Sequence, residues 1–500
     1  MPPDPVSVSF VDAMASMGDD RLQLLRERLR AVGFDGAFAA RLARPGERLD
    51  DALRTPIRIW HARRMSEPAA IAARVLLLHD AVPRTEAERI FGDVGPLLGC
   101  GMLEETAAGL TSRVHAGFAG DALVLGDPPG AGPDSVAPLG GGTLALLAAV
   151  SPARRVPAAL DLGCGAGAVA LLLSRTSDRV LATDVSARAI AFARLNVRLN
   201  AVDNVELRQG DLYEPSGHER FDLVACQPPF LARRPEAPLS AYVHGGRRGD
   251  ELTLEVLRGA PDRLTTGGRA VVLADLPVVD GDPIEERVRA AVGSAPVELL
   301  ALLSPAKNVD EYCTFHAAAE HASLAEDFAR AVIEQRDHLD GLGVRGLALT
   351  VVAVQPARAA GFRSTLAVRH ASDVAVAAPT LDRVLEAHRL AFGDDETLLG
   401  ARLRAPVGSR VVRQAAANGA TGASSIVHPP PGRPEWPAVF DEPTTALLER
   451  IARARTVHDA ARSLAEERVF PLEEASALVM QAAREGLRRG ALDVEERKAR

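Results

Sequence analysis

Short apolar runs alternate with helix-like segments through the middle of this chain. The runs cover residues 156–162, 179–184, 205–211, 221–226, 269–275, 297–303 and 347–354. An apolar run of four to eight residues bounded by turn residues is typical of a buried strand. Strands joined by helical crossovers run parallel in one sheet. The pattern therefore predicts an α/β fold, with a Rossmann-like, doubly wound core of seven strands.

The two flanks of this core have a different pattern. Before the core, the apolar spacing predicts helices and then two short strands, at 20–30, 57–79, 85–91, 96–103, 110–115 and 121–125. After it, we expect helices and one short strand, at 381–392, 408–413, 445–455, 457–467 and 473–488. Because 500 residues exceed an ordinary single domain, we expect three: a helical or winged-helix domain (1–135), the core (136–372) and a small, mainly helical domain (373–500).

The end of the first core strand has a cluster of glycines. Asp161 is the last residue but one of the strand, and Gly163, Gly165 and Gly167 lead directly into a helical segment. Such glycines allow a sharp turn and a close approach of ligand to backbone, beside the free N–H groups of a helix start. The next strand ends in Asp184, 21 residues beyond Gly163. An acid there accepts ribose hydroxyls, which suits NAD and S-adenosylmethionine equally.

The fourth strand ends in the tetrapeptide Gln227-Pro228-Pro229-Phe230. With the glycine turn, Asp184 and the third strand's Asp211-Leu212, it resembles the class I S-adenosylmethionine-dependent methyltransferases, and within them the N-methyltransferases that carry Asn-Pro-Pro-Tyr/Phe, such as the release-factor glutamine methyltransferases. The resemblance covers roughly residues 139–357. It implies S-adenosylmethionine as cofactor and a cofactor site made of Asp161, Gly163, Cys164, Gly165, Gly167, Asp184, Val185, Asp211, Leu212 and Gln227.

The resemblance also implies that Gln227, Pro228, Pro229 and Phe230 hold the methyl acceptor. Gln227 stands where the family has Asn, so its amide is one methylene further from the backbone. The acceptor atom therefore stays open between amine, ring nitrogen and oxygen. The glycine-rich loop 241–251 is expected over the acceptor with Tyr242, His244 and Arg247. We assign His244 as a general base, and the alternative is a histidine on a solvated loop.

The composition of the chain argues against several classes of ligand and partner. A net charge of −8 argues against broad nucleic-acid binding. The four cysteines lie far apart without a C-x-x-C pair, which predicts a reducing, cytoplasmic setting. The 12 histidines lack the spacing of metal ligands, so we expect no catalytic metal. Apolar runs are too short for a membrane span.

These features together predict an enzyme. We expect an S-adenosylmethionine-dependent methyltransferase whose acceptor is a nitrogen of a peptide, a protein side chain or a small molecule from natural product biosynthesis. Three alternatives stay open: a ribosomal RNA N-methyltransferase, a non-catalytic winged-helix regulator with a decayed core, and an NAD-dependent oxidoreductase. The sequence sets no oligomeric state.

Overall fold

The computed structural model describes residues 8–43, 51–128, 131–132, 134–137, 139–151, 154–235, 242–320, 326–357, 364–369, 376–414, 424–430, 433, 437–469 and 471–495. Its contacts group the chain into two compact units. Unit 1 comprises residues 1–301 and 306–366, and unit 2 comprises residues 302–305 and 367–500. The domain boundaries expected near residues 135 and 372 stay a prediction.

The core of unit 1 is one sheet with the strand order β14-β12-β13-β11-β8-β5-β6-β7. Its strands are β5 (Val156–Leu162), β6 (Ser177–Asp184), β7 (Val205–Gln209), β8 (Phe221–Cys226), β11 (Leu264–Val279), β12 (Val297–Leu303), β13 (Val344–Pro356) and β14 (Ser364–Arg369). All seven expected strands are present, which confirms the Rossmann-like core. Sequence reasoning missed β14 at the edge.

Strand direction divides this sheet. The strands from β7 to β11 pair in parallel, whereas β13 runs antiparallel to β11 from the pair Ala270–Val354 to the pair Val279–Val344. The expected doubly wound sheet assumed parallel crossovers throughout. A connection that contains helices also permits an antiparallel return, so β13 is a departure from that expectation.

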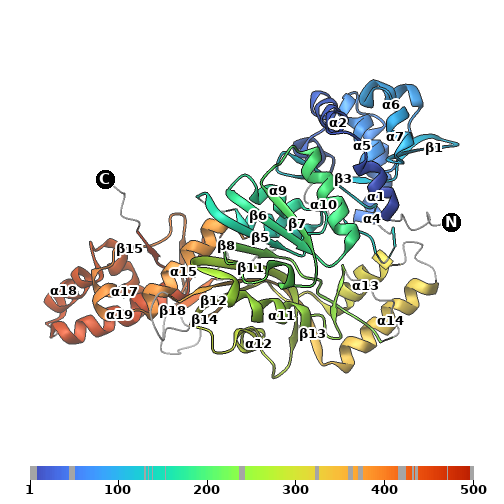
Figure 1. The fold of residues 1–500 in the computed structure, drawn as a ribbon. Helices are drawn as coiled ribbons and strands as arrows, with labels where there is room; N and C mark the ends of the chain where they lie inside the picture. Colours follow the sequence, from blue (N-terminus) through green and yellow to red (C-terminus); the bar gives the residue numbers. More distant parts are fainter. Residues whose placement is uncertain are drawn as a thin grey trace. The chain divides into compact units, whose positions relative to one another are not determined.

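Helices cover both faces of the sheet. Figure 1 shows α10 (Ala187–Leu199) and α12 (Ile284–Val292) on opposite faces. The other helices of the core are α8 (Gly141–Val150), α9 (Ala168–Leu173), α11 (Glu251–Gly259), α13 (Val309–Glu320) and α14 (Glu326–Gly341), with 3-10 turns η1 (Glu214–Ser216) and η2 (Ala260–Arg263). Two short strands, β9 (Leu231–Ala232) and β10 (His244–Gly246), pair outside the main sheet.

The N-terminal region of unit 1 is helical and ends in two hairpins. Its elements are α1 (Val8–Ala15), α2 (Asp19–Ala31), α3 (Gly36–Ala43), α4 (Asp51–Ala62), α5 (Pro68–Leu76), α6 (Arg84–Phe91), α7 (Gly95–Gly99), β1 (Leu103–Thr106), β2 (Gly109–Ser112), β3 (His115–Ala119) and β4 (Ala122–Gly126). This confirms the expected order of helices followed by strands, but two expected elements are divided.

Both divisions have a local cause. The helix expected over 57–79 is two helices, because Pro68 lacks the N–H that a continuous helix needs and instead starts α5. The strand expected over 110–115 is shared between β2 and β3. There the Ser112 hydroxyl donates to Val114 O at 2.7 Å and accepts from Val114 N at 3.1 Å, which turns the chain.

Helix α10 joins the N-terminal region to the core. Two asparagine side chains one turn apart on α10 form hydrogen bonds with the backbone of β4, as a neighbouring strand would. The Asn196 amide bonds Leu125 N and O at 2.8 and 2.7 Å, and the Asn200 amide bonds Leu123 N and O at 3.1 and 2.7 Å. These bonds satisfy backbone groups that would otherwise be buried without partners.

Unit 2 contains helices and a small sheet. Its elements are α15 (Ala378–Phe392), α16 (Asp395–Gly400), β15 (Leu403–Arg404), β16 (Arg410–Gln414), β17 (Ser424–His428), β18 (Ala438–Asp441), α17 (Glu442–Arg453), α18 (Val457–Arg468), α19 (Leu472–Arg488) and β19 (Asp493–Val494). The four expected long helices are present. The sheet β16-β17-β18 extends the single strand that the sequence predicted.

Side-chain caps explain where the helices of unit 2 begin. Thr456 accepts a hydrogen bond from Asp459 N at 3.0 Å and starts α18, while Asp441 accepts one from Thr444 N at 2.7 Å and starts α17. Between these helices and α19, side chains such as Ile451 and Val479 are buried in one apolar core. Among the described residues of both units, no helix is long and apolar enough to cross a membrane.

Candidate active site

A cavity of about 530 Å³ lies at the carboxyl ends of the parallel strands of unit 1. Leu162 of β5, Asp184 of β6 and Cys226 of β8 are the last residues of their strands, and all three line it. Parallel α/β sheets bind ligands at this edge because the loops that follow the strands converge there. The cavity is therefore the candidate active site.

The glycine turn after β5 forms one wall of the cavity. Gly163, Gly165 and Gly167 have φ angles of +73°, +51° and +85°, a region that side chains disfavour. A Cβ on Gly163 or Gly165 would meet no atom within 4 Å, so both face open space. Gly167 differs, because a Cβ there would lie 3.2 Å from Ala193 Cβ. Gly167 thus permits close packing of α9 against α10, and it does not line the cavity.

Asp184 is held by the backbone of the glycine turn. Its carboxylate accepts hydrogen bonds from Gly165 N and Ser186 N, each at 2.9 Å, and burial raises its pKa. A carboxylate has about four acceptor positions. Two of them are used by the backbone, so Asp184 keeps the capacity to accept two further hydrogen bonds from a ligand.

Asp161 lies deeper in the same wall. Its carboxylate accepts one hydrogen bond, from Ala170 N at 2.8 Å. Burial raises the pKa of Asp161 to about 7, and the neighbouring charge of Asp184 acts in the same direction. The hydroxyl of Thr183, which also lines the cavity, is buried without a hydrogen-bond partner among the described residues. Asp161 and Thr183 can therefore form further hydrogen bonds with a ligand.

Gln227 lies at the other end of the cavity with its amide turned toward the start of α8. Thr143 Oγ1 donates a hydrogen bond to Gln227 Oε1 at 3.1 Å. A Cβ on Gly142 would come within 2.3 Å of Gln227 Nε2, so only glycine leaves room for this amide. The extra methylene of Gln227 is thus taken up by contact with α8, and Pro228, Pro229 and Phe230 follow it along the cavity wall.

The glycine-rich loop, of which residues 242–251 are described, packs directly on this tetrapeptide. A Cβ on Gly245 would lie 2.4 Å from Pro229 O and 2.8 Å from Phe230 Cα. Glu251 accepts hydrogen bonds from the backbone N–H groups of Arg248 and Gly249, each at 2.9 Å. The glycines therefore let the loop lie against the backbone of the tetrapeptide.

A buried ion-pair network anchors the same loop. Asp250 is 1% exposed and accepts hydrogen bonds from Arg248 Nε at 2.8 Å and Arg287 Nε at 2.9 Å. Removing one partner of such a buried pair leaves an uncompensated charge, which is strongly destabilising. The loop is thereby tied to α12, which carries Arg287.

The cavity gathers most, but not all, of the residues that the sequence singled out. Of the residues expected over the acceptor, Tyr242 lines the cavity, whereas His244 and Arg247 do not. Of the expected cofactor residues, Gly167 alone is not in the lining. The expected cofactor residues that do line the cavity are Asp161, Gly163, Cys164, Gly165, Asp184, Val185, Asp211, Leu212 and Gln227. Their individual roles stay predictions.

Sequence reasoning missed Phe315 and His316, which line the cavity. Both belong to α13. His316 lies near enough to His244 for the two side chains to interact electrostatically, and His244 pairs with Leu231, directly after the tetrapeptide. A signal was present, because Tyr312, Phe315 and His316 are close together in a chain with only 4% aromatic residues. Among the described residues, no group of three or more His, Cys, Asp or Glu side chains is arranged to hold a metal ion.

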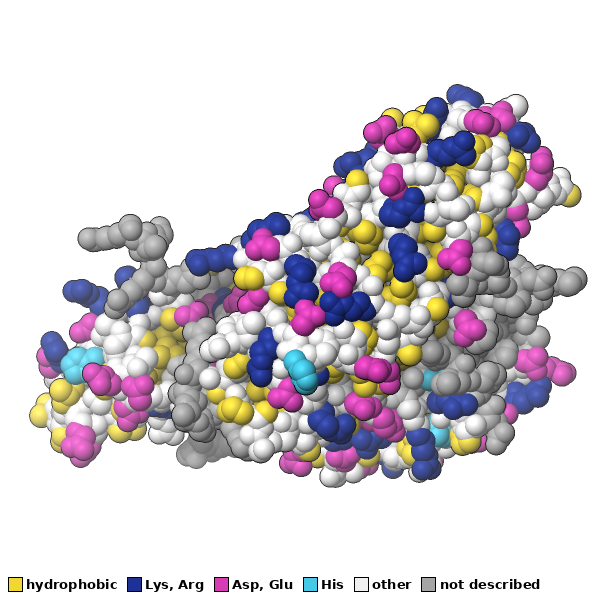
Figure 2. All heavy atoms as spheres, in the orientation of Figure 1, with side chains coloured by type: hydrophobic (Ala, Val, Ile, Leu, Met, Phe, Trp, Pro, Cys, Tyr) yellow, Lys and Arg dark blue, Asp and Glu magenta, His cyan; other side chains and the backbone are white. Residues whose placement is uncertain are grey.

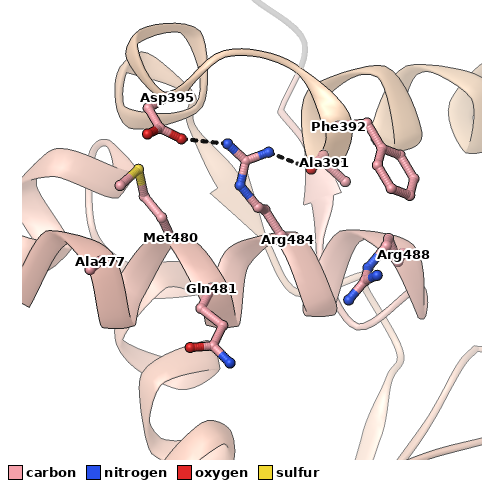
Figure 3. A pocket seen from close by; sticks show the side chains of 8 residues that line it. All are labelled: Ala391, Phe392, Asp395, Ala477, Met480, Gln481, Arg484 and Arg488. Atoms are coloured by element: carbon pink, nitrogen blue, oxygen red, sulfur yellow. Dashed lines mark hydrogen bonds and ion pairs between the residues drawn. The ribbon is translucent and has the colours of Figure 1, made fainter. Parts of the chain in front are cut away.

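A second cavity, of about 540 Å³, lies in unit 2 (Figure 3). It is lined by Ala391, Phe392, Asp395, Ala477, Met480, Gln481, Arg484 and Arg488. Its single carboxylate, Asp395, is ion-paired with Arg484 at 2.6 Å. Its one carboxylate is thus neutralised by an arginine, and the candidate chemistry belongs to the cavity of unit 1.

Comparison with known proteins identifies the core. Residues 135–279 match the family model described as the methyltransferase small domain. This segment is a class I methyltransferase domain. It contains the glycine turn, Asp184, Asp211 and the Gln-Pro-Pro-Phe tetrapeptide.

Curated relatives agree on the type of methyltransferase. The release factor glutamine methyltransferase of Xylella fastidiosa is 40% identical over 124 residues, which are 22% of this chain and 44% of that protein. The ribosomal protein uL3 glutamine methyltransferase of Bradyrhizobium diazoefficiens is 36% identical over 121 residues, which are 22% of this chain and 38% of that protein. The chain thus spans less than half the length of these relatives.

Solved structures overlap the methyltransferase domain only loosely. An rRNA methylase from Streptococcus thermophilus is 17% identical, covers 42% of this chain and 93% of its own, and has a TM-score of 0.25. An overlap this low supports no inference about activity.

S-adenosylmethionine is the cofactor of the methyltransferase domain, and the residues of the cavity fit it. Asp184 has acceptor positions left for ribose hydroxyls, and Gly163 and Gly165 leave the backbone open to a close ligand. Asp161 offers a buried carboxylate to a positively charged group. The chemistry of these groups matches that of a nucleoside with a cationic end.

Proposed function

We propose that this chain transfers a methyl group from S-adenosylmethionine to a side-chain nitrogen of a protein, with the amide of glutamine as the acceptor. One observation carries the proposal: Asp184 and Asp211 line the same cavity as Gln227 and Phe230. The names of the relatives, which describe glutamine methylation in release factors and in ribosomal protein uL3, support a protein amide as acceptor.

Catalysis in this proposal comes from positioning. The cofactor supplies a methyl group on a sulfonium, which is already activated for transfer. The new bond joins this carbon to the acceptor nitrogen, the carbon–sulfur bond breaks, and the nitrogen loses one proton. Tyr242 and Phe315 at the acceptor end are 49% and 54% exposed, so water reaches the site and accepts that proton. The task of the protein is to align the two reactants.

Other acceptors have less support. Ribosomal RNA would require a basic surface, but the chain has a net charge of −8. Figure 2 shows acidic and basic side chains interspersed over the visible face of the molecule. The comparisons offer no support for a small natural product as acceptor. A protein of the translation apparatus as acceptor favours action in the cytoplasm.

A labelling experiment tests this proposal. The full chain is incubated with methyl-labelled S-adenosylmethionine and, separately, with purified bacterial release factor, ribosomal protein uL3 and total RNA. We expect label on one of the proteins and a mass shift of one methyl group on a glutamine. The variant Asp184→Ala, assayed in parallel, shows whether the label depends on the cavity. Label in RNA alone would overturn the proposal.

A further inference from the structure

The acceptor end of the cavity needs more hydrogen-bond acceptors than Gln227 alone provides. On the proposed function, an amide NH₂ must be held so that its nitrogen faces the methyl group. Gln227 Oε1 already accepts the hydroxyl of Thr143 at 3.1 Å. Its Nε2 can only donate, which suits the acceptor's carbonyl. Oε1 keeps one lone pair, enough for one N–H of the acceptor NH₂, so the second N–H needs another partner. An unpaired buried N–H costs about 1–3 kcal/mol.

Helix α13 brings an imidazole to this end of the cavity. His316 lines the cavity beside Phe315. Its ring lies 4.2 Å from the Tyr312 ring, centroid to centroid, at an interplanar angle of 65°, and 5.2 Å from the Phe315 ring at 89°. Tyr312 is 3% exposed and anchors this cluster in the core. Two aromatic neighbours thus fix the position of the imidazole, and its nitrogens have no hydrogen-bond partner among the described residues.

The surroundings of His316 keep it neutral. Burial lowers its pKa to about 3, and the nearby Lys307 and His244 act in the same direction. A neutral imidazole has one N–H donor and one nitrogen that accepts. Its accepting nitrogen is thus available at physiological pH, when an exposed histidine would be partly protonated.

We propose that His316 is a substrate-binding residue, whose ring nitrogen accepts an N–H of the acceptor amide while Phe315 covers the aliphatic part of the same side chain. This inference rests on the proposed function and adds to it the group that orients the acceptor. It also favours one type of acceptor nitrogen over another. Lys307, although paired with Asp275 at 2.9 Å, adds positive charge beside this site, which disfavours a cationic amine and favours a neutral amide.

Three variants of the full chain separate the hydrogen bond from the packing. His316→Phe keeps an aromatic ring against Tyr312 and removes the accepting nitrogen. His316→Gln retains an accepting oxygen. His218→Ala changes an exposed histidine of unit 1 that does not line the cavity and serves as control.

The kinetic readout uses release factor as acceptor. We expect KM for the acceptor to rise about tenfold in His316→Phe, the loss of one hydrogen bond of roughly 1.4 kcal/mol, with unchanged affinity for S-adenosylhomocysteine. His316→Gln should recover most of the loss, and His218→Ala should match the wild type. An acceptor KM in His316→Phe equal to that of the wild type would overturn the inference.

A second readout does not depend on turnover. The protein is loaded with S-adenosylhomocysteine, and N-acetylglutamine amide is titrated in while the imidazole ¹⁵N signals of His316 are followed. We expect the accepting nitrogen to shift with a saturable curve, and no shift at saturating amide overturns the inference. If the shift occurs but no acceptor protein is labelled, the inference stands and the proposed protein acceptor falls. If wild-type protein fails to bind S-adenosylhomocysteine, the proposed function itself falls.

Discussion

Thr143 donates a hydrogen bond to Gln227 across 3.1 Å and thereby links the start of α8 to the tetrapeptide that follows β8, 84 residues later in the chain. In this contact the carbonyl oxygen of the Gln227 amide faces Thr143, and its NH₂ group points away from the hydroxyl. Gly142 leaves the space that this amide occupies. The acceptor end of the cavity is thus built by α8 as much as by the tetrapeptide.

A double-mutant cycle tests this link. Gln227→Ala removes the amide and should lower kcat by up to about a hundredfold, because misplacement of the acceptor by about 1 Å has that cost. Thr143→Val keeps the shape and removes a hydrogen bond of about 1 kcal/mol, so a loss of about fivefold is expected. The double variant should be no worse than Gln227→Ala alone, measured by single-turnover kinetics. Multiplicative losses would show that the two residues act independently.

Asp184 is expected to dominate cofactor affinity. Asp184→Ala removes the acceptor for Gly165 N and Ser186 N and for the ribose hydroxyls, so affinity for S-adenosylhomocysteine should fall about a hundredfold or more, the equivalent of one or two charge-assisted hydrogen bonds. Asp184→Asn retains one accepting oxygen, so its affinity for S-adenosylhomocysteine should lie between those of the wild type and Asp184→Ala. Isothermal titration calorimetry measures both. An unchanged affinity in Asp184→Ala would contradict the ribose assignment.

The sequence predicted the core well because strong local signals marked it. Strands of a covered sheet give short apolar runs bounded by turn residues, so each of the seven was located. Edge strand β14 and the direction of β13 depend on long-range pairing, which leaves no local pattern. Pro68 divides the helix expected over 57–79, and Ser112 divides the strand expected over 110–115. Hydrophobic periodicity is judged over a window of many residues, so it does not detect an interruption at one residue.

The site residues that directly follow a core strand could be predicted from the sequence. Those that come from helix α13 could not. Asp161, Asp184 and Gln227 each stand at a strand end, so their order along the chain fixed their convergence. Phe315 and His316 reach the cavity through α13, whose packing depends on the buried Tyr312. Their closeness to Tyr312 in a chain poor in aromatic residues was the only local signal, and it did not indicate a cavity. His244 has the chemistry for the task assigned to it but lies outside the lining.

The close packing of the glycine-rich loop predicts a position-specific effect of alanine. Gly245→Ala would bring a Cβ within 2.4 Å of Pro229 O and 2.2 Å of Gly249 O, and backbone atoms cannot move aside easily. We expect a loss of about 1–3 kcal/mol in the free energy of unfolding, as for overpacking elsewhere. Gly267→Ala, in exposed β11 backbone with no atom within 4 Å of the new Cβ, is the matched control. Urea denaturation compares the two, and equal losses would refute the packing argument.

The raised pKa of Asp161 predicts a pH dependence of cofactor binding. In the free protein its carboxyl titrates near a pKa of about 7, because burial disfavours the charged form. The ammonium of S-adenosylhomocysteine favours the ionised carboxylate, so affinity should increase as the pH rises from about 6 to about 8, by at most about tenfold per pH unit. Binding below the pKa should release a proton, which calorimetry detects by comparing buffers with different ionisation enthalpies. Asp161→Asn keeps an acceptor for Ala170 N and should bind with little pH dependence. A wild-type affinity that is constant over this range would show that Asp161 does not face the cationic end of the ligand.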